Sequence, residues 1–391
     1  MTRFKGQLLS ILASLFLLCT ILPAFAVDTD GDGLTDDVEA QLGSSPRHKD
    51  IFVYINSFNW NGKNMKPRGN FTQIVKAVFS TAPVTNPDGT TGINLHVEMG
   101  PNIKTNNIIA TWTEFDAYKA QYLPASKRGT HHYCLFVGEI NIGGEYSISG
   151  VSRNGSNFKA GASDFMVALG HPGWWNTPTQ ALFKWTQAGT FIHELGHNLG
   201  FMHGGNDHIT YKPNHLSLMS YAYQTDGIPI TVPGQGLFYL YDYARFAGPN
   251  LNENNLNEAA GMGQKLNDQG TFYGARWWVT DSGRVGVESF DARSNVDWND
   301  NGVIQSGVRM NLNRGGDLKI NTLKGGVVEW SKVQYRGGQI GKASILADSA
   351  LPYEFQYPCM KASERPILPL SVSQNVPRIT FQELQALRKK K

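Results

Sequence analysis

Apolar and polar positions alternate in blocks through the middle of the chain and predict strands separated by helices. Four short runs, rich in β-branched and aromatic residues, are typical of buried strands. They cover residues 51–55, 93–97, 134–137 and 165–169. Between the first two runs, residues 71–80 have apolar side chains at helical spacing, and Pro83 then breaks the pattern.

A longer helix is predicted over residues 178–199. Thr177 is a suitable N-cap, Pro178 is a suitable first residue, and Gly200 ends the helical pattern. The order strand, helix, three strands and long helix predicts an α/β (α+β) fold with a mixed, mostly parallel sheet. After about Gln264 the chain is richer in Gly, Asn and short β-like runs, which predicts a small β-rich C-terminal portion.

The first 26 residues are typical of a signal peptide. Arg3 and Lys5 precede an apolar stretch at residues 8–23, and Ala24-Phe25-Ala26 provides the small residues that signal peptidase reads. The stretch is short for a membrane span, and an uncleaved anchor is the alternative interpretation. We therefore expect an exported protein, secreted or at the periplasm or cell surface, that begins near Val27.

The charge of the chain gives no sign of a nucleic-acid or membrane partner. The chain has 35 Lys and Arg against 32 Asp and Glu, and removal of Arg3 and Lys5 leaves 33 basic residues. Four of these basic residues, Arg388 to Lys391, are expected to form a solvated tail. The remaining length is sufficient for one large domain or two ordinary ones. We expect a monomer that contacts neither nucleic acid nor, after signal cleavage, the membrane.

Two cysteines, Cys134 and Cys359, remain after removal of the signal peptide. An exported compartment permits a disulfide between them, but their separation along the chain leaves both a disulfide and two free thiols open. A cysteine-rich scaffold is excluded. No cysteine lies between Val27 and the predicted catalytic region, so a latency cysteine in a propeptide is excluded as well.

Directly after Val27 the chain has the spacing of a twelve-residue calcium loop. Counted from Asp28, oxygen-bearing side chains occupy positions 1, 3, 5, 9 and 12, and glycine occupies position 6, where the loop turns sharply. The predicted Ca²⁺ ligands are Asp28, Asp30, Asp32, the Leu34 carbonyl, Asp36 and Glu39. Without a cation these carboxylates would repel one another. The alternative interpretation is an acidic, disordered linker.

The end of this segment, from Glu39 through Gly43 to Pro46, resembles the thrombospondin type 3-like calcium repeats of bacterial exported proteins. The resemblance implies a structural Ca²⁺ that stiffens an N-terminal module. A second loop begins at Asp297 with oxygens at positions 1, 3 and 5, but position 12 is Val308. We expect a turn there and leave a second calcium site open.

The strongest chemical signal is the motif HELGHNLGFMH that begins at His193. His193 and His197 are one helical turn apart, so both imidazoles can reach one zinc ion. Glu194 lies beside the metal and suits a general base. Gly200 can adopt a left-handed conformation that ends the helix and brings His203 to the third ligand position. Three histidines leave the fourth position open for water, as a catalytic zinc site requires.

With the downstream segment Ser217-Leu218-Met219-Ser220-Tyr221, the motif resembles that of metzincin zinc metallopeptidases, which join HExxHxxGxxH to a methionine turn. The resemblance covers about residues 50–261. It implies that Met219 forms an apolar floor beneath the histidines. It also implies that Tyr221, as in astacin-like and serralysin-like members, lies near the zinc and can donate a hydrogen bond to the reaction intermediate. The chain departs from the best-known members because neither an N-terminal cysteine switch nor a long propeptide is evident.

From these features we expect a secreted zinc endopeptidase that acts on protein or peptide substrates. Zinc would lower the pKa of its bound water towards about 7. Glu194 would accept the proton as the water attacks the peptide carbonyl, and would return it to the leaving amine. The alternative is a calcium-dependent surface or adhesion protein with a structural metal site, but such a site needs no acid beside its ligands.

The expected organisation has four parts. They are a signal peptide (1–26), a calcium repeat (27–49), a metzincin-like catalytic domain (50–264) and a β-rich portion of unknown role (265–391).

Overall fold

The structure, a computed structural model, describes residues 27–153, 161–175, 180–278, 286–313, 316–341, 359–365 and 375–389. The expected signal peptide and the expected start of the long helix at Thr177 and Pro178 lie outside these ranges. Within them, no helix combines the length and the apolar character that crossing a bilayer requires.

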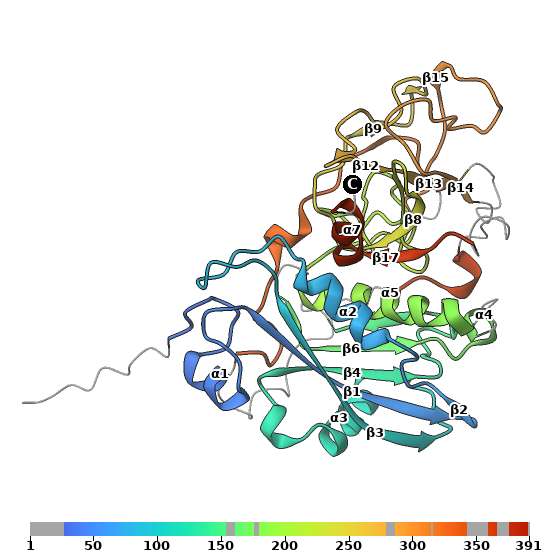
Figure 1. Cartoon of the computed structure of the whole chain (residues 1–391). Coiled ribbons are helices and arrows are strands. Elements are labelled where there is room, and N and C mark those ends of the chain that lie inside the picture. Colours follow the sequence, from blue (N-terminus) through green and yellow to red (C-terminus); the bar gives the residue numbers. More distant parts are fainter. Residues whose placement is uncertain are drawn as a thin grey trace, which may run out of the picture.

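A mostly parallel six-stranded sheet forms the lower layer in Figure 1 and confirms the predicted fold class. Its strands β1 to β6 comprise Asp50–Trp60, Lys63–Asn64, Asn94–Thr105, His131–Val137, Gly150–Ser152 and Asp164–Ala168. The order is β2-β1-β4-β6-β5, and β3 also pairs with β1. The pairs β1–β3, β1–β4 and β4–β6 are parallel, whereas β2 and the edge strand β5 are antiparallel to their neighbours.

Helices cover both faces of this sheet, which explains why β4 and β6 are buried along their whole length. α2 (Phe71–Ser80) and α5 (Gln180–Asn198) lie on one face, and α3 (Trp112–Tyr122) lies on the other (Figure 1). Phe71 of α2 and Phe191 of α5 pack edge to face with ring centroids 5.2 Å apart. α2 has the predicted bounds, and the apolar residues that predicted it are buried; Phe79, near its end, packs edge to face on Tyr243 and Trp330.

A second sheet lies on the opposite side of α5, in the upper half of Figure 1. Its strands are β7 (Ile228–Val232), β8 (Gly236–Tyr241), β11 (Asn267–Asp268), β12 (Thr271–Tyr273) and β17 (Arg378–Thr380), in the order β11-β12-β7-β8-β17. Trp185 of α5 contacts Tyr241 of β8 with ring centroids 4.8 Å apart. α5 is therefore enclosed between two sheets and buried over most of its surface.

Short strand pairs confirm the β-rich character expected after Gln264. They are β9 (Leu251–Asn252) with β16 (Thr322–Leu323), β10 (Leu256–Asn257) with β15 (Ser306–Val308), and β13 (Ala275–Trp278) with β14 (Gly286–Ser289). The second sheet takes strands from both sides of residue 264, and the domain boundary itself stays a prediction. Short helices in the described residues include α4 (Pro172–Trp175), η1 (Ala125–Lys127), η3 (Glu329–Lys332) and η5 (Ala362–Glu364).

Two further helices lie near the ends of the described chain. α1 (Asp36–Leu42) is capped by the Thr35 side chain and lies at the left of the sheet in Figure 1. α7 (Phe381–Arg388) begins with a capping box formed by Thr380 and Glu383. Arg388 pairs with Asp268 at 3.0 Å. The expectation that Arg388 belongs to a solvated tail is therefore wrong, because its guanidinium joins the helix to β11.

Candidate functional site

The N-terminal loop gathers its carboxylates into two overlapping groups. Asp28, Asp30 and Asp32 form the first group, and Asp32, Glu39 and Asp50 form the second; in each, one oxygen per residue lies within 4.8 Å of the others. Glu39 belongs to α1 and Asp50 begins β1. The second group therefore joins the calcium-type loop to the central strand of the large sheet.

Buried oxygens without partners show that these groups fit a cation. Both carboxylate oxygens of Glu39, Oδ2 of Asp30 and Oδ2 of Asp50 are buried without a hydrogen-bond partner. Burial and the neighbouring acids raise the pKa of Asp32 to about 7 and that of Glu39 to about 8. Crowded carboxylates behave this way when no positive charge offsets them, and hard oxygen ligands are those that Ca²⁺ prefers.

The predicted calcium ligands are not all brought together. The Asp36 carboxylate accepts hydrogen bonds from the Thr29 amide at 2.8 Å and the Thr29 hydroxyl at 2.7 Å, and it joins neither group. Leu34 is buried within the loop, where its amide donates to Asp32 Oδ1 at 2.9 Å. Asp50 could not be found from the twelve-residue spacing, because it lies beyond the loop.

The three histidines of the motif converge in the buried interior next to α5. Gly200 ends α5 with φ of 89°, the left-handed conformation predicted for it, so the chain turns back and His203 faces the other two rings. The ring centroids of His197 and His203 are 4.6 Å apart, and those of His193 and His197 are 4.8 Å apart. Local backbone geometry therefore brings together residues from the helix and from the turn that follows it.

Hydrogen bonds to the backbone orient two of these rings. Nδ1 of His193 lies 2.8 Å from the Leu218 carbonyl, and Nδ1 of His197 lies 2.9 Å from the Phe201 carbonyl. Because a carbonyl can only accept, Nδ1–H donates in both cases and Nε2 is the ring atom that can bind a metal. Nε2 of His197 lies 3.0 Å from Nε2 of His203, so the two candidate ligand atoms already face each other. Burial lowers the pKa of His193 to about 4, and also holds the pKa values of His197 and His203 well below the usual range. The imidazoles are therefore neutral, as metal ligands must be.

Glu194 is fully buried beside the histidines without joining their group. The Ser152 hydroxyl donates to its Oε2 at 3.0 Å, whereas Oε1 has no geometric hydrogen-bond partner. Burial raises the pKa of Glu194 to about 8, although hydrogen bonds from Cys359 and Ser152 act in the opposite direction. A carboxyl group with this pKa can both take up and release a proton near neutral pH.

Met219 and Tyr221 border the site from the segment after the motif. Met219 is fully buried, and its sulfur lies so close to Gly196 of α5 that a Cβ on Gly196 would be 2.4 Å from it. The Tyr221 ring packs against His203 with centroids 4.7 Å apart. Met219 therefore contacts the histidine helix, and Tyr221 lies beside the candidate ligand rings.

Cys359 completes the group of ligand atoms. Its sulfur and one ring nitrogen from each of His193, His197 and His203 all lie within 4.8 Å of one another. The fourth position, which the sequence leaves open for water, thus faces a thiol. Cys359 is free, as is Cys134 of β4, so the structure favours two free thiols over the disulfide. Sequence reasoning missed this role of Cys359, because no local motif surrounds the residue.

The Cys359 side chain also contacts the two candidate catalytic residues. Burial and the Glu194 carboxylate raise the pKa of the Cys359 thiol, whereas the Tyr221 hydroxyl acts in the opposite direction. A set of three imidazoles and one thiolate is a ligand combination that zinc accepts in tetrahedral geometry. The residues present therefore fit a zinc ion.

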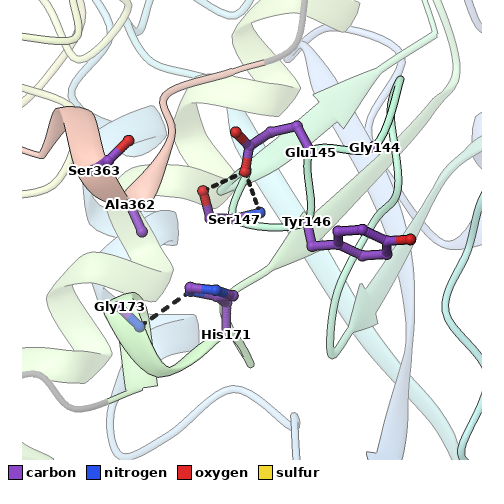
Figure 2. Close-up of a pocket in the computed structure, with 8 residues that line it drawn as sticks. All are labelled: Gly144, Glu145, Tyr146, Ser147, His171, Gly173, Ala362 and Ser363. Carbon is purple, nitrogen blue, oxygen red and sulfur yellow. Dashed lines mark hydrogen bonds between the residues drawn. The ribbon is translucent and has the colours of Figure 1, made fainter.

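A surface pocket of about 420 Å³ lies at the other end of the segment that carries Cys359. Figure 2 shows Ala362 and Ser363 of η5 on one side of it, with Glu145, Ser147 and His171 on the other. The Glu145 carboxylate accepts hydrogen bonds from the Ser147 amide at 2.8 Å and the Ser147 hydroxyl at 2.6 Å. The histidines of the motif do not line this pocket.

The loop at Asp297 forms the turn that was expected. Its carboxylate accepts hydrogen bonds from the Asn301 amide at 3.1 Å and the Gly302 amide at 2.6 Å. In the described part of the chain, this loop is not among the groups that bring three metal-binding side chains together.

Residues 28–46 match the bacterial TSP3 repeat family. No curated protein matches the chain. The repeat is of the calcium-binding type and is typical of extracellular bacterial proteins, in agreement with the carboxylate groups around Asp32. The match ends before β1 and therefore describes the N-terminal module alone.

Proposed function

We propose that this protein is an exported zinc-dependent peptidase of the metzincin kind. The observation that carries the proposal is the buried arrangement of three histidine ligands with a carboxylate that is not itself a ligand. Glu194 has one oxygen held by Ser152 and the other without a geometric partner. A purely structural zinc site has no need of such an acid next to its ligands.

A zinc ion held by His193, His197 and His203 would polarise a peptide carbonyl and acidify a water molecule. Glu194 is positioned to accept the proton of the attacking water and to deliver it to the leaving amine. The Tyr221 hydroxyl is a candidate donor of a hydrogen bond to the developing oxyanion, since its ring packs against the ligand His203 with centroids 4.7 Å apart. Met219 keeps the histidine helix in place from below.

A second function, a calcium-dependent surface protein with a structural zinc site, is favoured by one observation. Cys359 brings the number of protein ligands to four, and structural zinc sites are closed in this way. The TSP3 repeat agrees with either function, because calcium modules of this kind are common to extracellular proteins of both classes.

Hydrolysis of a degenerate peptide library separates the two functions. We would compare Cys359→Ala with the double variant Cys359→Ala/Glu194→Gln, both loaded with one equivalent of zinc. The proposal expects cleavage by the first protein and a loss of at least about 10³-fold in the second, because Gln cannot transfer the proton. If the zinc-loaded Cys359→Ala protein cleaves no peptide bond, the peptidase proposal is wrong and the structural function stands.

A further inference from the structure

The surroundings of the Cys359 sulfur indicate a bound ion shared with the histidines. Nε2 of His193 is fully buried, has no hydrogen-bond partner and belongs to the same group as the sulfur. Zinc lies about 2.0–2.1 Å from imidazole nitrogen and about 2.3 Å from thiolate sulfur, so tetrahedral ligands are roughly 3.3–3.6 Å apart. In the structure the four ligand atoms lie within 4.8 Å of one another, so small side-chain adjustments would bring them to this geometry.

The backbone next to Cys359 pairs with the edge of the large sheet through an isolated antiparallel bridge between Ile148 and Lys361. β5 is the edge strand, and the residues just before and within it pair antiparallel with residues 359–362. Three main-chain hydrogen bonds join the segments: Ser149 amide to Met360 carbonyl (3.0 Å), Cys359 amide to Gly150 carbonyl (3.4 Å) and Ala362 amide to Ser147 carbonyl (2.9 Å). Extended peptides bind to sheet edges through the same kind of pairing.

Side chains hold the far end of this segment as well. Lys361 lies 3.5 Å from the Glu145 carboxylate, and the Tyr211 hydroxyl donates to the Glu364 carbonyl at 3.3 Å. Arg365 lies 3.8 Å from the carboxylate of Asp226. Figure 2 shows the segment at Ala362 and Ser363 facing the Glu145 loop across the pocket. The segment is therefore held from the metal group to the pocket.

We infer that residues 359–365 are an internal inhibitor, in which Cys359 is the fourth ligand of the zinc and residues 359–362 occupy the edge that a peptide substrate would use. This inference has two halves. The inhibitory half, that residues 359–362 block the substrate edge, rests on the proposed peptidase function, whereas the ligand half, that Cys359 binds the metal, does not. Coordination replaces the S–H bond by a sulfur–zinc bond, and the proton leaves to solvent through Glu194. Without the sulfur–metal bond, the main-chain hydrogen bonds are the part of this pairing that remains at the sheet edge, and a substrate peptide can displace them.

Cobalt substitution tests the ligand half without any measurement of activity. A thiolate bound to Co²⁺ gives an intense near-ultraviolet charge-transfer band, which histidine ligands do not give. The full-length protein with one equivalent of Co²⁺ should show this band, Cys359→Ala and Cys359→Ser should lose it, and Cys134→Ala should keep it. All four proteins should bind one equivalent of metal. If the full-length protein holds its Co²⁺ without the band, or if Cys359→Ala retains the band, the inference is overturned.

Peptide hydrolysis by the zinc-loaded proteins tests the inhibitory half. Cys359→Ala should cleave at least about tenfold faster than both the wild type and Cys134→Ala. Equal cleavage by Cys359→Ala and the wild type would overturn the inhibitory role while the peptidase function stands. No cleavage by either protein, together with the Cys359-dependent band, would overturn the peptidase function and the inhibition but keep Cys359 as a metal ligand.

Discussion

The carboxylate of Glu194 occupies the space that a side chain on Gly150 would need. A Cβ on Gly150 would lie 2.5 Å from Oε1 of Glu194 and 2.6 Å from the Met166 carbonyl of the neighbouring strand. The edge strand and the histidine helix approach this closely only because residue 150 is glycine. The position of the candidate base therefore depends on a residue that contributes no chemistry of its own.

Gly150→Ala should lower peptide hydrolysis without loss of zinc. In the Cys359→Ala background we expect kcat/KM to fall about 10²-fold, because a shift of about 1 Å in a catalytic group can cost this much. Zinc content should stay near one equivalent. Ser152→Ala, which removes only the hydrogen bond to Oε2, should cause a smaller loss. Full activity of the Gly150→Ala protein would contradict the role of Glu194 as base.

Gly196→Ala should destabilise the protein through its contact with Met219. The added Cβ would meet the Met219 sulfur at 2.4 Å and the Tyr243 ring at 3.0 Å, and overpacking of this kind costs about 1–3 kcal/mol. Urea unfolding of the zinc-loaded protein measures the loss. The double variant Gly196→Ala/Met219→Ala should lose less than the sum of the single variants; strictly additive losses would show that the two residues are not in contact.

Calcium should stabilise the fold through Asp50. Calcium removal by dialysis at constant zinc should lower Tm, since an ion at a hundredfold excess over its Kd contributes about 2.7 kcal/mol. Asp50→Asn should weaken calcium binding at least about tenfold in calorimetric titration. Asp36→Asn is the matched control, because its carboxylate is engaged by Thr29. An equal loss of calcium affinity in both variants would show that Asp36 is a calcium ligand, as the sequence predicts.

Acid should remove the contribution of Asp226 to stability. Burial raises the pKa of Asp226, but Arg365 and Arg378, together with Arg276, bring it down to about 2. Because the folded-state pKa is depressed, the contribution is complete above the unfolded-state pKa of about 3.9 and is lost as the pH falls towards 2. Asp226→Asn should be at least about 2 kcal/mol less stable than the wild type at pH 6. The difference should shrink at pH 3.5; a constant difference would contradict the prediction.

Features that depend on neighbours in sequence could be predicted. The buried strands and α2 follow from apolar periodicity, which needs only a window of residues around each position. The meeting of His193, His197 and His203 follows in the same way from one helical turn and a glycine in the left-handed conformation. The calcium-type loop likewise depends on the spacing of residues within one short segment, and its match to the bacterial TSP3 repeat confirms that it is of the calcium-binding type.

Features that depend on tertiary contacts could not be predicted from the sequence. Cys359 lies far along the chain from the histidines, and its position depends on strand pairing with residues 147–150, which leaves no periodic signal. Asp50 has the appearance of a polar residue that begins a strand. Its place beside Asp32 and Glu39 depends on a contact across the chain, in which the Asp50 amide donates to Asp32 Oδ2 at 2.7 Å. Arg388 resembles the lysines that follow it, yet the capping box at Thr380 makes it the last residue of a helix.

The order of elements along the chain has a consequence for biosynthesis. Residues after Cys359 supply β17, so the second sheet that covers the histidine helix is incomplete until the segment that carries Cys359 has been made. During that interval the sheet edge at β5 is unpaired and the three imidazoles have no thiol opposite them. A chain truncated before residue 359 would lack both the thiol opposite the imidazoles and the strand β17 that completes the second sheet. Premature termination would therefore remove the proposed inhibitor together with part of the support of the histidine helix.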